Sequence, residues 1–155
     1  MSVIDGLPGH ILLNHFVVVL GPLTAILAIL CAVWSVARQR LIWLTLALAV
    51  ATLILTPLTI SSGDWLYVKL GSPPVVDQHG QLGATLVYIV AALAVTVTAL
   101  AVIHLRQARG RTVKTAVRAV VAVLVVVAAT GTLVQTYRVG ETGARAAWGS
   151  VTASA

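Results

Sequence analysis

The sequence AVVAVLVVVAA at residues 119–129 contains no polar side chain. It belongs to an uncharged run from Ala119 to Tyr137, close to the length of about 20 residues that crosses the hydrocarbon layer of a bilayer. A strand of a membrane barrel would alternate apolar and polar residues, and this sequence does not. Since only a helix then satisfies its own backbone in lipid, the run predicts a transmembrane helix.

Three further uncharged runs, each longer than the first, precede it: Gly6–Ala37, Leu41–Gly63 and Gln78–Leu105. Each is long enough to cross a bilayer as a helix. The pattern predicts one all-α transmembrane domain over residues 1–155. We expect its four helices at about 8–37, 41–60, 77–105 and 112–137. An outer loop at 61–76 and an outer C-terminal tail at 138–155 complete the predicted domain.

The composition also indicates an integral membrane protein. Of 155 residues, 59% are hydrophobic and only 9% are charged, and the mean hydropathy is +1.03. A soluble domain carries about 25% charged residues, and a chain this short cannot bury so much apolar surface away from water. These values exclude a soluble enzyme and a disordered chain. The single cysteine, Cys31, excludes an intrachain disulfide and any cysteine-based zinc or iron–sulfur site.

The basic residues are unevenly distributed along the chain. Seven of them lie in or beside the first and third connections, with no acid among them: Arg38, Arg40, Arg106, Arg109, Arg111, Lys114 and Arg118. The positive-inside rule makes this side cytoplasmic, so both termini and the 61–76 loop are predicted to lie outside. The same distribution favours contact with the lipid bilayer and argues against a nucleic-acid partner.

Short connections on the basic side predict an up-down four-helix bundle, with the first and third helices diagonal across the core. No long internal repeat is visible in the sequence. Three of the four histidines map to the outer half: His10 and His15 near the start of the first helix, and His79 at the start of the third. Because His10 and His15 are five residues apart, their side chains diverge by about 140° around the helix. We expect His15 and His79 to face each other through the bundle axis.

A redox cofactor site at this outer face is the first of two interpretations. A b-type haem takes two axial imidazoles from separate helices, and His15 with His79 is the best available pair. Gly83, one turn after His79, lets a flat macrocycle approach the backbone. Asp64 or Glu141 can hold the second ring nitrogen of a ligating histidine. Such a cofactor would serve membrane electron transfer.

A transition-metal site is a close variant of the first interpretation, because imidazole and carboxylate ligands suit zinc, copper(II) and iron alike. Its candidate ligands are His10, His15, His79, Asp64 and Glu141. The second interpretation is a cofactor-free accessory or structural subunit, whose polar groups clamp the loop and tail over the bundle, with Asp64 paired to Arg138 or Arg145. No catalytic residues are expected, since the sequence contains no phosphate loop and no HExxH motif. A stand-alone enzyme is not favoured.

Four motifs follow one another along the outer segments: GLPGH…NH at 6–15, SGDWL at 62–66, HGQLG at 79–83 and RVGETGARAAW at 138–148. In this order and spacing the chain resembles the bacterial four-span membrane family catalogued as domain of unknown function 2231. The resemblance covers essentially the whole chain. It implies a multi-pass protein of a bacterial plasma membrane, and relatives fused to Rieske or c-type cytochrome domains imply a redox partner of that kind.

Overall fold

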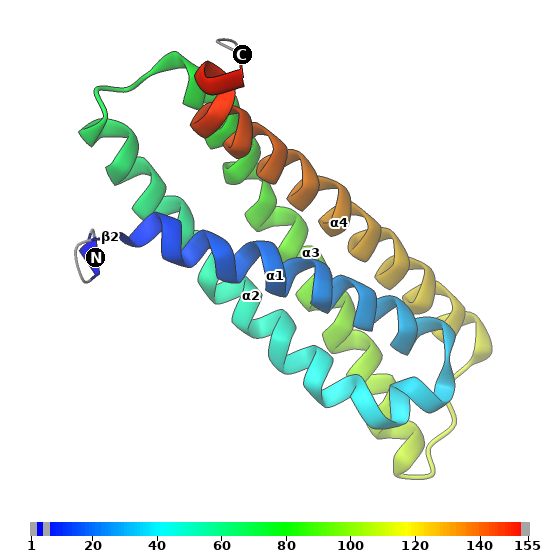
Figure 1. Cartoon of the computed structure of the whole chain (residues 1–155). Coiled ribbons are helices and arrows are strands. Elements are labelled where there is room, and N and C mark those ends of the chain that lie inside the picture. The colour runs from blue at the N-terminus through cyan, green and yellow to red at the C-terminus, as the bar shows by residue number, and fades with distance from the viewer. Residues whose placement is uncertain (1–2, 5–6, 153–155) are drawn as a thin grey trace.

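The computed structural model describes residues 3–4 and 7–152 and consists mainly of four long α-helices (Figure 1). The helices are α1 (Gly9–Val33), α2 (Ser35–Lys69), α3 (Asp77–Ala108) and α4 (Thr115–Thr152). Before α1, the two-residue strands β1 (Val3–Ile4) and β2 (Leu7–Pro8) form an antiparallel pair, and the 3-10 helix η1 (Pro74–Val76) precedes α3. The predicted all-α four-helix bundle is confirmed.

The surface of the bundle suits lipid rather than water. Each of the four helices is long and apolar enough to cross a membrane. Large apolar side chains stay exposed along all four of them, among them Phe16, Ile54, Val95 and Val127. Soluble monomers rarely expose continuous apolar surface of this kind. The chain is a multi-pass membrane protein, as its composition predicts.

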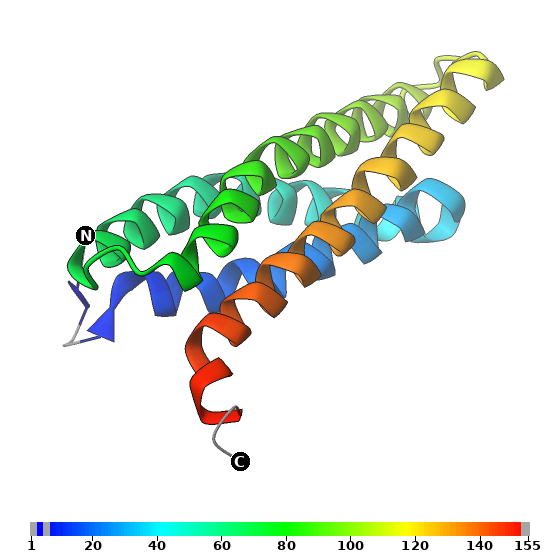
Figure 2. The ribbon, with the colours of Figure 1, turned by 90° about the horizontal axis from the view of Figure 1, so that it is seen from above.

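The helices pack in the order expected of an up-down bundle. α1 packs against α2 and α4, α3 packs against the same two helices, and α1 and α3 lie diagonally across the core. The view from above shows the chain running back and forth through neighbouring helices (Figure 2). Consequently the N-terminal ends of α1 and α3 lie at the same end of the bundle as the C-terminal ends of α2 and α4.

Two helices are longer than the sequence predicts. α2 continues through most of the predicted loop, and α4 continues through most of the predicted tail. Only residues 70–76 connect α2 to α3. Ser61 and Ser62 are accommodated within α2 because their hydroxyls donate to carbonyls of the preceding turn, at 3.0 and 2.9 Å. The chain leaves the helix where Gly71 and Ser72 adopt φ angles of 80° and 56°, which no right-handed helix contains.

The first connection is shorter than predicted and lies earlier in the chain. α1 and α2 are separated by Trp34 alone, whose backbone is extended with φ −124° and ψ 112°. Arg38 and Arg40, expected in the connection, therefore lie in the first turns of α2. No glycine or proline marks the break in the sequence, so its position was not readable from turn signals.

Small side chains fill the centre of the bundle and let the helices approach closely. Ala25, Ala28, Ala49 and Ala129 are completely buried, a composition typical of membrane helix contacts. Four threonines on one face of α2 are buried as well: Thr45, Thr52, Thr56 and Thr59. Each of these hydroxyls donates to the carbonyl four residues earlier in its own helix. The threonines therefore contribute mainly small side chains to the packing, and their hydroxyls need no partner from another helix.

The hairpins α1–α2 and α3–α4 bury the same positions. At one constant offset in residue number, a series of buried positions in α1 corresponds to a series in α3. In chain order, the α1 positions are Val17, Gly21, Thr24, Ala25, Ala28, Cys31 and Ala32, and the α3 positions are Leu86, Val90, Leu93, Ala94, Val97, Leu100 and Ala101. At another constant offset, Ala49, Thr52 and Thr56 of α2 correspond to Ala129, Thr132 and Thr136 of α4. The hairpins run in the same direction, so an approximate two-fold axis along the bundle relates them. No long repeat is visible in the sequence, but these buried positions recur at constant offsets, and half of the pairs also share their residue type.

Candidate functional site

Two histidines from diagonal helices meet at the end of the bundle that carries both chain termini. His10 lies in the first turn of α1 and His79 in the first turn of α3. Their ring centroids are 6.1 Å apart and the ring planes are nearly perpendicular, at 83°. Both side chains are half-buried. They occupy equivalent places in the two hairpins, so the approximate two-fold axis passes between them.

Each imidazole is fixed by a hydrogen bond to the partner helix of its own hairpin. Nδ1 of His10 donates to the carbonyl of Thr59 at 3.0 Å, and Nδ1 of His79 donates to the carbonyl of Val139 at 3.0 Å. A carbonyl oxygen only accepts, so Nδ1 carries the proton in both rings. An imidazole that donates from Nδ1 ligates a metal through Nε2 when that nitrogen carries no proton.

Each ring also lies against a glycine, four residues after the carbonyl that holds it. A Cβ atom on Gly63 would come 2.9 Å from Nδ1 of His10, and one on Gly143 would come 3.0 Å from Cε1 of His79. Any larger residue would displace the ring. The two hairpins therefore build the same arrangement of histidine, carbonyl and glycine.

A cavity of about 320 Å³ lies beside the two rings, within the range of about 300–1,000 Å³ that is typical of ligand sites. Most of its wall is apolar, with contributions from leucine and valine side chains of α1, α2 and α3. The ends of α2 and α3 diverge at this point and residues 70–76 bridge them (Figure 1). Across this bridge Tyr67 donates a hydrogen bond to Asp77 at 2.7 Å, and both residues line the cavity.

One buried polar atom in the cavity wall has no partner. Thr136 lines the cavity, and its Oγ1 is buried without a hydrogen bond within the part of the chain that the structure describes. Its equivalent in the other hairpin, Thr56, donates to the carbonyl of Thr52 at 2.7 Å. A buried hydroxyl without a partner costs about 1–3 kcal/mol.

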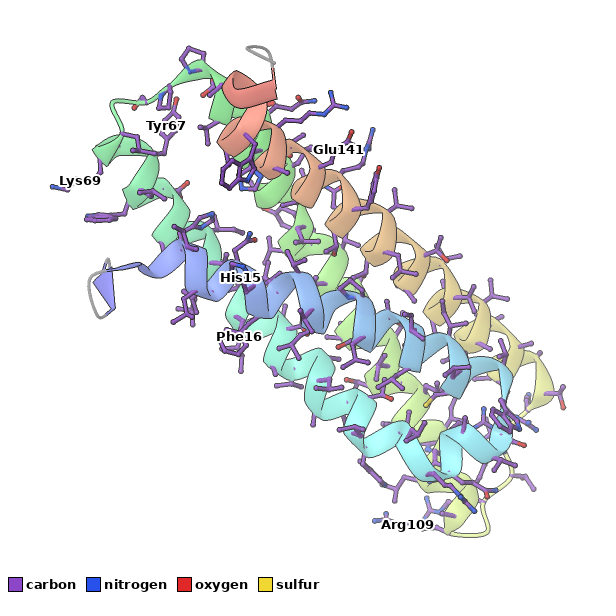
Figure 3. All side chains as sticks on the ribbon, viewed as in Figure 1. His15, Phe16, Tyr67, Lys69, Arg109 and Glu141 are labelled. Atoms are coloured by element: carbon purple, nitrogen blue, oxygen red, sulfur yellow. The ribbon has the colours of Figure 1, made fainter. Side chains whose placement is uncertain are left out.

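The structure corrects the expected pair of His15 and His79. His15 is exposed on α1, and its Nδ1 bonds the carbonyl of Ile11 in its own helix at 2.6 Å (Figure 3). His10 takes the place opposite His79 instead. The two histidines of α1 point in different directions, as their five-residue separation predicts, and the buried face of α1 continues from His10 through Val17.

The five predicted metal ligands do not assemble. Glu141 (Figure 3) pairs with Arg145 on α4 at 2.6 Å, where the Arg145 side chain is exposed and the Glu141 side chain is half-buried. Asp64 lines the cavity but makes no ion pair among the described residues, so the expected bridge from it to Arg138 or Arg145 is not formed. Within residues 3–4 and 7–152, no group of three or more histidine, cysteine, aspartate or glutamate side chains is placed to hold a metal ion.

Gly83, expected to let a flat macrocycle approach the backbone, leaves open space beside it. It lines the cavity, and a Cβ atom there would meet nothing within 4 Å. The glycines that contact the histidines, Gly63 and Gly143, were missed although both fall inside the quoted motifs. Both glycines follow the residue whose carbonyl holds the histidine, Thr59 or Val139, by the same number of residues. This equal spacing could have identified them, but it becomes visible only once the two hairpins are aligned.

No protein-family model, no curated protein and no solved structure matches this chain.

Proposed function

We propose that His10 and His79 are the two axial ligands of a b-type haem and that the protein carries electrons at the outer face of a bacterial plasma membrane. The observation that supports this is the pair of imidazoles from diagonal helices, each with Nδ1 held by a backbone carbonyl and with no hydrogen bond at Nε2 among the described residues. Two ligands suffice for a haem, whose remaining iron ligands belong to the macrocycle. The absence of a larger ligand group among the described residues is therefore compatible with it.

The distance between the rings matches one ion shared through the two Nε2 atoms, and it also matches a direct edge-to-face contact of the rings. A transition metal lies about 2 Å from an imidazole nitrogen, which itself lies about 1 Å from the ring centre, so two rings sharing one ion have centroids about 6 Å apart. The observed separation is 6.1 Å. The cavity, the open backbone at Gly83 and the unpartnered hydroxyl of Thr136 support an occupant at this place. When bound, the haem would supply one-electron chemistry, and the protein would supply its axial ligands and an apolar wall.

Orientation and partners belong to the same proposal. The seven basic residues lie at the end opposite the histidines, where Arg109 is found (Figure 3), and the positive-inside rule places that end in the cytoplasm. Both termini and the histidine pair then face outward, toward a Rieske or cytochrome-type partner. Membership of the family catalogued as domain of unknown function 2231 stays a prediction.

A cofactor-free structural subunit is the second candidate. It is supported by the way each imidazole ties two helices together and fills the space over a glycine. In this case the histidines would serve packing alone.

A difference spectrum with metal analysis separates the two functions. The protein is purified from membranes of haem-supplemented cells, as wild type and as His10→Ala, His79→Ala and His15→Ala. The proposal expects a Soret band that shifts on reduction and one iron per chain, lost in the first two variants. His15→Ala is the matched control, because it removes an exposed imidazole from the same helix, and it should keep both signals. A wild type without haem, or equal loss in the control, overturns the proposal.

A further inference from the structure

A second cavity, of about 470 Å³, lies at the opposite end of the bundle and differs from the first in its chemistry. Three helices contribute to its wall: α2, α3 and α4. Its polar lining residues are Ser35, Arg38, Gln39, His104, Gln107 and Arg118. No carboxylate lines it. This cavity therefore combines two arginines with no acid, whereas both aspartates of the histidine cavity, Asp64 and Asp77, lie at the other end of the bundle.

The two arginines of this cavity lack counter-charges. Among the described residues, neither Arg38 nor Arg118 forms an ion pair. The described acids, Asp64, Asp77 and Glu141, all belong to the segments at the other end of the bundle. Arg38 is half-buried, so its charge is less well hydrated than that of a free surface arginine. Cationic groups that converge on a cavity without acids make a site for an anion.

The helix ends strengthen this conclusion. α2 and α4 both begin at this end, and neither has an acidic residue in its first turn. Trp34, at the N-cap of α2, provides no side-chain hydrogen bond to the free amides. The N-terminal end of a helix carries partial positive charge and attracts anions. Arg38 and Arg118, each in the first turns of its helix, add to that charge rather than compensating it.

We propose that this cavity binds the phosphate group of an anionic phospholipid. The cavity lies where four membrane-spanning helices end, which is the depth of the lipid headgroups. Trp43 is exposed near it, with its ring 6.5 Å from the ring of His104, and tryptophans at this depth mark the membrane interface. A lipid can place its phosphate in the cavity while its chains lie along the exposed apolar faces of the helices. Free phosphate offers the same group without the apolar contact.

Binding is tested with phosphatidylglycerol as the probe, added to the detergent-solubilised full chain and followed by native mass spectrometry. Phosphatidylcholine and inorganic phosphate are the comparison ligands. The variant Arg38→Gln/Arg118→Gln removes both cavity cations. The control Arg40→Gln/Arg109→Gln removes the same charge from exposed arginines outside the cavity. Circular dichroism verifies that both variants remain helical.

The proposal expects retention of one phosphatidylglycerol per wild-type chain. Because charge-assisted hydrogen bonds are strong, the cavity variant should bind at least about tenfold more weakly, and the control should change by less than about twofold. Equal weakening in both variants would show a diffuse charge effect and overturn the site. Displacement of the lipid by inorganic phosphate at equal concentration would show a soluble anion as the occupant and overturn the lipid assignment.

Discussion

The substitution Gly143→Ala tests the arrangement of histidine, carbonyl and glycine directly. The new methyl group would lie 3.0 Å from Cε1 and 3.1 Å from Nδ1 of His79, closer than normal contact allows. The ring must move and its hydrogen bond to Val139 weakens or breaks. We expect the same result at Gly63, where the equivalent methyl group would lie 2.9 Å from Nδ1 of His10.

The expected change in the free energy of unfolding follows from three contributions, of which the third opposes the first two. Overpacking a tight site costs about 1–3 kcal/mol, and the lost hydrogen bond costs about 1 kcal/mol. Alanine is a better helix former than glycine by about 1 kcal/mol, which offsets part of the loss. The net expectation for Gly143→Ala is a destabilisation of about 1–3 kcal/mol, with loss of any haem bound by His79.

The matched control is Gly140→Ala, one turn earlier on the same helix, where an added Cβ would meet nothing within 4 Å. This variant should be as stable as wild type or more stable by up to about 1 kcal/mol. The measurement is thermal unfolding in one detergent, followed by circular dichroism, together with the haem content. If Gly143→Ala unfolds at the same temperature as Gly140→Ala, the ring does not occupy the place described and the reasoning fails.

Three further predictions concern polar side chains near the histidine cavity. Thr136→Val should not destabilise the cofactor-free protein in thermal unfolding, because its hydroxyl makes no hydrogen bond there; a clear loss would reveal a missing partner. Gln135→Leu removes two hydrogen bonds to α3, of 2.9 and 2.7 Å, and should cost about 1–2 kcal/mol in the same assay; no change would contradict these bonds. Glu141→Gln breaks an exposed pair one turn apart, so its effect on unfolding should stay below about 0.5 kcal/mol, and a larger effect would indicate a role that the structure does not show.

The four helices were predictable because lipid restricts a long uncharged run to a helix. The ends of the helices were less predictable, because a chain that has left the hydrocarbon layer is no longer restricted to a helix. Residues 61–69 were assigned to the outer loop, yet the hydroxyls of Ser61 and Ser62 bond within α2 and Gly63 accommodates His10. Local polarity alone did not distinguish a helix end from a helix that reaches into the interface.

The choice between His10 and His15 was a question of register. The sequence predicts that they diverge, but it does not say which one faces inward. Positions seven apart answer this in retrospect, because His10, Val17, Thr24 and Cys31 form one face of α1, all of them buried except the half-buried histidine. The face of α3 that begins at His79 has the same spacing. A comparison of the two helices would have selected His10.

The repeated hairpin also explains how the histidine site depends on the whole bundle. Each imidazole is oriented inside its own hairpin, by the carbonyl of Thr59 or of Val139, but the pair exists only when the hairpins pack together. A ligand that binds both Nε2 atoms therefore connects the halves and stabilises the packed state by mass action. If the histidines have a purely structural role, no ligand stabilises the packed state in this way, since each ring already makes its hydrogen bond without a ligand. A rise in unfolding temperature on adding haem, present in wild type and absent in both His10→Ala and His79→Ala, belongs to the first case alone.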